Sequence, residues 1–168
     1  INLRSMLGDP DRIGEYFKDA DMRIPRYKEA NRRFDGLVRK AIKSGKALPA
    51  ADVDRIGDAY KAKASGNRAK VVARNEAFTA QAAGREEAYQ QLLDDGKVEA
   101  VTVRWQHNLS KNAREDHLAM DGEVIQLGET FNFPDGTRMR HPHDPAGGAE
   151  HSINCRCIAV YRTRIAKD

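Results

Sequence analysis

The stretch Val98-Glu99-Ala100-Val101-Thr102-Val103-Arg104-Trp105 marks the point where the pattern of the chain changes. Every second residue from Val101 to Trp105 is apolar and polar residues lie between them, which is the periodicity of a half-buried strand. Before this stretch, apolar residues recur at intervals of three and four, which is typical of helices. The sequence therefore predicts an α+β protein, with an N-terminal helical region followed by a small antiparallel β-rich unit with long loops.

Four helices are predicted before this strand, over residues 10–21, 25–44, 49–64 and 67–94. The first begins at Asp9-Pro10-Asp11, where an acid precedes a proline at the first helical position. Breaks are expected at Pro25, Ser44-Gly45-Lys46 and Ser65-Gly66-Asn67, because proline and glycine interrupt helices. Two domains follow from this pattern: a helical extension over 1–66 and a C-terminal domain over 67–168.

The residues after the strand predict short elements separated by loops. These are a short helix over 111–120, a strand over 124–127, a hairpin over 131–138, a Pro/Gly loop over 141–148 and a final strand over 155–164.

Composition restricts the class of protein. The chain has 168 residues, of which 40% are hydrophobic and 32% are charged. It has no apolar run near the roughly 18–20 residues that a membrane-spanning helix needs, so the sequence predicts no membrane association. Because it begins with Ile1 rather than Met, we expect it to be part of a longer protein.

The formal net charge of +4 permits contact with nucleic acid but does not require it. The densest basic patch consists of Arg32, Arg33, Arg39, Lys40 and Lys43. It is the best position for contact with DNA phosphates. The alternative is a solvated helix face, because acidic residues are interleaved with the basic ones in this region.

All five histidines, both cysteines and the single tryptophan lie between Trp105 and Cys157. Cys155 and Cys157 are two residues apart at the predicted start of a strand, so both thiols should point to the same side. Two thiolates can share a zinc ion, which needs four ligands. The same region offers further donors, namely His117, His141, His143, Asp144 and His151. The alternative is that the cysteines are small buried residues, that His143 and His151 lie in surface loops and that His117 is a capping or core residue near a helix end.

An enzyme is the second interpretation of this region. Carboxylates that could act as an acid or a base occur at Asp116, Asp121, Glu123 and Glu129. The chain has none of the common nucleophile, phosphate-binding or metalloprotease motifs. The best case for catalysis is therefore a metal-dependent, nuclease-like hydrolase that uses the His/Cys site.

Several segments of the last third occur in an order that resembles a known family. They are Val103-Arg104-Trp105, Ala113-Arg114-Glu115-Asp116-His117, Met120-Asp121-Gly122-Glu123-Val124, Gly128-Glu129-Thr130-Phe131, His141-Pro142-His143-Asp144-Pro145 and Ile153-Asn154-Cys155-Arg156-Cys157. Ala73-Arg74-Asn75-Glu76-Ala77 resembles a further segment of the same family. The set is similar to the phage Mu F-like family of minor head (head morphogenesis) proteins of tailed bacteriophages and prophages.

This resemblance covers about residues 70–160 and implies a structural role in the virion. The implied protein lies inside the capsid near the portal vertex and acts in head assembly and in genome packaging or ejection. Its implied partners are the portal protein, other head proteins and packaged DNA, and before assembly it would be in the cytoplasm of the bacterial host. No catalytic activity follows from the resemblance.

The resemblance also ranks the metal donors. It carries over His117, Asp144, Cys155 and Cys157, whereas His143 and His151 stand at positions where the family varies. We therefore expect a structural zinc ion on His117, Cys155 and Cys157, with Asp144 or His143 as the fourth ligand.

Overall fold

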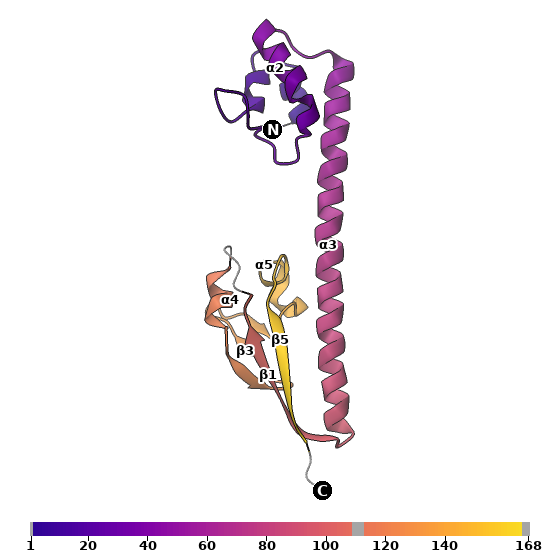
Figure 1. Ribbon diagram of the computed structural model, residues 1–168, viewed down its shortest axis with the longest axis vertical. Coiled ribbons are helices and arrows are strands. Elements are labelled where there is room, and N and C mark those ends of the chain that lie inside the picture. The colour runs from indigo at the N-terminus through magenta and orange to yellow at the C-terminus, as the bar shows by residue number, and fades with distance from the viewer. Residues whose placement is uncertain (1, 109–112, 166–168) are drawn as a thin grey trace. The chain divides into compact units, whose positions relative to one another are not determined.

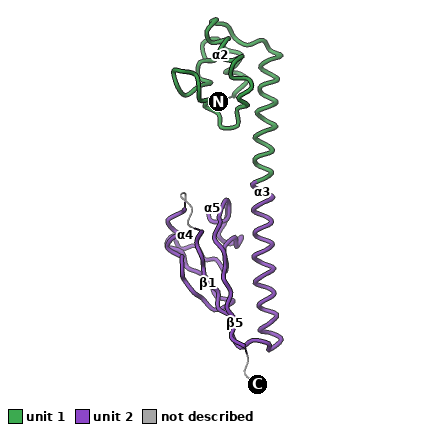
Figure 2. Tube along the Cα trace, viewed as in Figure 1, with its two compact units in different colours: residues 1–70 green, residues 71–168 purple. Residues whose placement is uncertain are grey.

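The computed structural model describes residues 2–108 and 113–165 (Figure 1). In these residues helices come first and antiparallel strands last, which confirms the predicted α+β class. The chain divides into two compact units, Ile1–Lys70 and Val71–Asp168, called unit 1 and unit 2 below (Figure 2). No helix among the described residues is long and apolar enough to span a membrane.

Unit 1 is built from short helices and the first part of a long one. Its elements are α1 (Leu3–Leu7), the 3-10 turns η1 (Ile13–Tyr16) and η2 (Arg32–Phe34), α2 (Asp35–Ser44) and the start of α3 (Ala50–Asp94). One core joins them, and its fully buried members include Met6, Leu7, Tyr16 and Val38. Gly45, in the left-handed conformation with φ 62°, ends α2 as predicted.

The predicted helix over 10–21 and the first part of the predicted helix over 25–44 are wrong. Only the four residues of η1 are helical in the first range, and helix in the second begins at η2. Local polar contacts explain the difference, because the Asp19 carboxylate accepts hydrogen bonds from the backbone N–H groups of Arg23 and Ile24. An Asp side chain that satisfies backbone donors in this way stabilises a turn instead of a helix.

The predicted break at Ser65-Gly66-Asn67 is also wrong, because α3 continues for 45 residues. Glycine inside a helix costs only about 1 kcal/mol relative to alanine. The flanking residues are mostly alanine, lysine and arginine, which favour helix strongly enough to offset that cost. The end predicted at Gly96 is correct, since this residue has φ 68° two residues after the helix.

Unit 2 contains a three-stranded antiparallel sheet in the order β2-β1-β5. Its strands are β1 (Val98–Gln106), β2 (Val124–Gln126) and β5 (Ile158–Ile165), and β1 pairs with β5 along almost its whole length. Val101, Val103 and Trp105 are buried, as the alternation predicted. The predicted hairpin is present as β3 (Phe131–Asn132) and β4 (Arg138–Met139).

Trp105 is the centre of the core of unit 2. It is fully buried, and the rings of Phe131, Phe133 and His117 pack edge-on against it at 5.2 to 5.7 Å between centroids. Three short helical elements complete the unit: α4 (Glu115–Ala119), the 3-10 turn η3 (Pro145–Gly147) and α5 (Gly148–Ser152). The helix predicted over 111–120 is thus present as α4, although 111 and 112 fall outside the described residues. Because α4 carries His117, the tryptophan core fixes the position of that imidazole.

Candidate metal centre

His117, Cys155 and Cys157 form a buried group of three donors that can hold a metal ion. His117 Nδ1 lies 3.5 Å from each of the two sulfur atoms, and all three donor atoms lie within 4.8 Å of one another. Each of the three residues is at most 4% exposed. One imidazole and two thiolates are three of the four ligands of a common type of zinc site.

The two cysteines are brought together by a turn and not by strand alternation. β5 begins at Ile158, so the prediction that the strand includes Cys155 is wrong. Asn154 has a positive φ of 59°, and the backbone N–H of Cys157 donates to Cys155 Sγ at 3.4 Å. The Arg114 guanidinium holds this turn by donating to the Ile153 carbonyl oxygen at 2.6 Å. The turn wraps the chain around the sulfur of Cys155 and directs both thiols at His117.

Because the two thiols lie close together, their pKa values shift in opposite directions. The hydrogen bond from Cys157 lowers the pKa of Cys155 to about 7, although burial acts in the opposite direction. The same hydrogen bond, with Cys157 as donor, and burial raise the pKa of the Cys157 thiol. One sulfur is thus ready to act as a thiolate ligand, and the second thiol loses its proton when a cation binds.

A series of hydrogen-bonded side chains supports the far side of the His117 ring. His117 Nε2 lies 3.2 Å from His151 Nδ1, and His151 Nε2 lies 2.9 Å from Asp135 Oδ2. One arrangement of protons satisfies the whole chain: His117 Nε2–H donates to His151, and His151 Nε2–H donates to the carboxylate. This arrangement leaves His117 Nδ1 without a proton and directed at the sulfurs, which is the form that binds metal.

The role of His151 and Asp135 in supporting His117 was not predicted from the sequence. His151 was only one of several spare donors, and Asp135 was a turn residue of the predicted hairpin. The two residues are 16 positions apart, and His151 is 34 positions from His117, so no local spacing joins them. Only the fold of unit 2 brings them together.

Asp144, which was predicted as a possible fourth ligand, does not belong to the group of three. Its Oδ2 accepts from the backbone N–H of Arg140 at 2.8 Å and its Oδ1 from that of Ala146 at 3.0 Å, so it caps η3. Burial alone would raise the pKa of this carboxyl, but these two hydrogen bonds and the charges of His141 and Arg140 outweigh burial and lower it. The carboxylate has a structural role in the loop.

His143, the other predicted fourth ligand, also lies outside that group. Its ring packs on Phe78 of α3 at 4.9 Å between centroids, and its carbonyl oxygen accepts from Thr79 Oγ1 at 3.2 Å. Burial, followed by the nearby His141, lowers the pKa of His143. His143 lines a cavity of about 430 Å³, which Cys155 and Cys157 also line.

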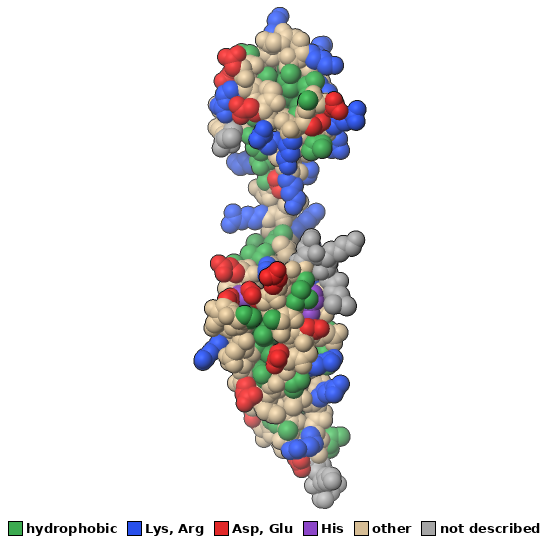
Figure 3. Space-filling view, turned by 90° about the vertical axis from the view of Figure 1, so that its left-hand side faces the viewer, with side chains coloured by type: hydrophobic (Ala, Val, Ile, Leu, Met, Phe, Trp, Pro, Cys, Tyr) green, Lys and Arg blue, Asp and Glu red, His purple; other side chains and the backbone are tan. Residues whose placement is uncertain are grey.

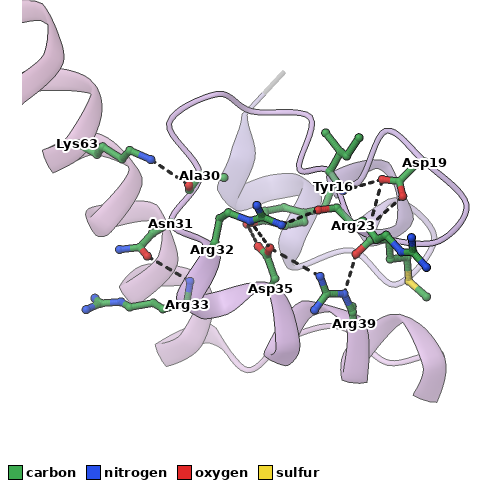
Figure 4. A network of polar contacts seen from close by, with 12 residues as sticks. Tyr16, Asp19, Arg23, Ala30, Asn31, Arg32, Arg33, Asp35, Arg39 and Lys63 are labelled. Atoms are coloured by element: carbon green, nitrogen blue, oxygen red, sulfur yellow. Dashed lines mark hydrogen bonds and ion pairs between the residues drawn. The ribbon is translucent and has the colours of Figure 1, made fainter.

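The predicted phosphate-binding residues of unit 1 have unequal roles. Arg39 Nε donates to the Met22 carbonyl oxygen at 2.7 Å, and an Arg32 guanidinium nitrogen donates to the Arg23 carbonyl oxygen at 3.0 Å. Both guanidinium groups also approach the buried carboxylate of Asp35 (Figure 4). These two arginines therefore hold the loop that replaces the predicted first helix.

The other three basic residues are exposed, as is the side chain of Arg32. Arg33 lies over the ring of Phe34 at 4.5 Å. Lys40 and Lys43 are exposed on α2 and form no ion pair with any residue in the described ranges. On the face of unit 1 in Figure 3, basic and acidic side chains are interspersed.

Comparison with known proteins gives one family and one curated relative. The family model "Phage Mu protein F like protein" matches residues 33–160. "Uncharacterized protein YqbB" of Bacillus subtilis (strain 168) is 32% identical over 94 residues, which are 54% of this chain and 29% of that protein. No solved structure was found to match the chain.

The capping role of Asp144 generates a prediction. Because the pKa of Asp144 is lowered in the folded state, its carboxylate stabilises the protein above the unfolded-state pKa, and this contribution is lost as pH falls through the folded-state pKa. We expect Asp144→Ala to lower the free energy of unfolding by about 1 kcal/mol at neutral pH, with a smaller difference below about pH 4. Urea titrations followed by the fluorescence of Trp105 measure both values. Loss of metal binding in this variant would instead identify Asp144 as a ligand.

Proposed function

The chain belongs to the family of phage Mu protein F like proteins, and on this premise we propose that it is a minor head protein of a tailed bacteriophage or prophage. The observation that carries the proposal is the extent of the family match, which includes the whole of α2 and α3, all donors of the candidate metal centre and the β1–β2 pair. The matched part of the chain spans 29% of the length of its curated relative.

We place the protein in the virion and propose that it contacts other head components. The finer proposal is a position inside the capsid near the portal vertex, with the portal protein as a partner and a role in genome packaging or ejection. Before assembly the protein would be in the cytoplasm of the bacterial host. The family supports the role in head morphogenesis.

Within this role, we propose that unit 2 contains a structural zinc ion bound by His117, Cys155 and Cys157. The donor chemistry fits zinc, because thiolate and imidazole are its preferred ligands. The contacts from His117 to His151 and from His151 to Asp135 are what a metal ligand requires, since metal-binding histidines usually donate their second N–H to such a partner. Small units with long loops gain much of their stability from such an ion.

A metal-dependent, nuclease-like hydrolase is the alternative use of the same donors. Catalytic zinc keeps one coordination position for water or substrate, whereas structural zinc has four protein ligands. The number of protein ligands therefore distinguishes the two roles.

Packaged DNA is a further partner that we propose, through Lys40 and Lys43 of α2. These lysines are exposed and lack ion-pair partners among the described residues, so their charges are available to phosphates. Arg32 and Arg39 are excluded from this proposal because they hold the loop of unit 1.

The proposed head function predicts that the polypeptide is present in assembled particles. In the phage or prophage that encodes it, mass spectrometry of gradient-purified heads should detect peptides of this chain at a small fraction of the amount of the major capsid protein. Disruption of the gene should reduce the yield of infectious particles, and a plasmid copy should restore it. Heads that contain portal protein but no peptide of this chain would contradict the proposal.

The zinc proposal predicts that the isolated protein contains about one zinc ion per chain. Removal of the ion by a chelator should lower the melting temperature and shift the fluorescence of Trp105 to longer wavelengths, because this buried ring packs against His117. Cys157→Ser should reproduce both changes without chelator. The proposal is wrong if zinc stays below about a tenth of an ion per chain and if chelation leaves melting unchanged.

The DNA proposal predicts salt-dependent binding that depends on α2. Fluorescence anisotropy with a duplex should give a logarithm of the binding constant that falls linearly with the logarithm of the salt concentration. The double variant Lys40→Ala/Lys43→Ala should make the slope of this line less negative by about 2. The charge-matched control Lys18→Ala/Lys61→Ala should leave the slope unchanged. Equal slopes for both variants would argue against α2 as the contact.

A further inference from the structure

A small cavity lies directly at the three donors. Its volume is about 30 Å³, and its lining includes His117, Cys155, Cys157 and one further histidine, His107. A space of about 10–15 Å³ is enough for one water molecule, so this cavity has room for an ion. A fourth protein ligand would therefore have to reach into this cavity.

His107 reaches this cavity because it continues the pattern of β1. Val103 and Trp105 are buried and Gln106 is exposed, so His107 lies on the inward face, two residues beyond the tryptophan. Its backbone N–H donates to Asp121 Oδ1 at 2.7 Å, which fixes the chain just after the strand ends. The residue is 8% exposed.

The imidazole of His107 has a buried nitrogen without a partner. Nδ1 is inaccessible to solvent and forms no hydrogen bond with any residue in the described parts of the chain. A buried polar atom in this state destabilises the folded protein. A cation in the adjacent cavity would remove this destabilisation, because imidazole nitrogen is a preferred zinc ligand.

We propose that His107 is the fourth ligand, so that His107, His117, Cys155 and Cys157 form a closed Cys2His2 site. The inference rests on the proposed zinc-binding function and deepens it. His107, like Asp144 and His143, lies outside the group of three donors that are within 4.8 Å of one another, and Nδ1 of His143 is also buried without a partner among the described residues. His107 is favoured because it lines the small cavity together with all three donors, whereas Asp144 and His143 do not line it. Asp144 is occupied by two backbone N–H groups, and His143 lines the larger cavity, which His117 does not line.

This assignment has a chemical consequence. With four protein ligands in place, no coordination position is left for a water molecule to become a nucleophile. The ion then crosslinks the end of β1, α4 and the turn before β5, and the role of the site is structural. The hydrolase alternative would require His107 to stay outside the coordination sphere.

Cobalt(II) replacing zinc in the full chain tests the assignment, since its visible spectrum reports coordination number and the number of thiolates. His107→Ala should weaken cobalt binding at least tenfold and change the ligand-field bands, because water replaces an imidazole. His143→Ala is the matched control, since it removes a buried histidine beside the same cysteines and should leave affinity and spectrum unchanged. Unchanged binding in His107→Ala, or weakened binding in His143→Ala, would overturn the proposal.

His107→Cys gives a gain of signal that does not depend on the stability of the alanine variant. If position 107 is in the coordination sphere, thiolate-to-cobalt charge-transfer absorption should rise to about 1.5 times that of the parent, as three thiolates replace two. An intensity equal to that of the parent would also overturn the proposal. A parent protein that binds no cobalt or zinc would instead refute the zinc-binding function, which separates the two failures.

Discussion

One imidazole nitrogen and two sulfur atoms converge in a buried space of unit 2, and this constraint governs the candidate metal centre. Two adjacent thiols cannot both ionise there unless a cation compensates them, and the opposite pKa shifts of Cys155 and Cys157 express this conflict. The neighbouring elements are arranged around the same point. Trp105 packs against the ring of His117, and the chain through His151 to Asp135 fixes its orientation.

The parts of this fold that local chemistry determines could be predicted from the sequence. Alternation identified β1, and glycines with positive φ mark the ends of α2 and α3. The failures occurred where neighbouring residues outweigh the preference of a single residue. Asp19 stabilises a turn where a helix was expected, and Gly66 is tolerated inside α3 because its neighbours favour helix.

The candidate site shows the same limit. The spacing of Cys155 and Cys157 suggested a shared ion, and family resemblance selected His117, so three donors could be predicted. The reason given for the cysteines was incorrect, because a turn at Asn154 and not a strand directs them. His151 and Asp135 could not be predicted, since only the folded unit brings them together. His107 could have been found by extending the alternation of β1 by one more step.

The pairing of β1 with β5 has a consequence for the order of events in folding. These strands flank about fifty residues of sequence that contain α4, the hairpin and all donors of the candidate metal centre. Contacts between such distant residues form slowly, because the entropy of closing a long loop must be lost before the contact is gained. The cysteines come just before β5, so an ion bound to them and to His117 would link the start of this strand to α4. Such an ion would therefore slow the dissociation of β5 from the sheet.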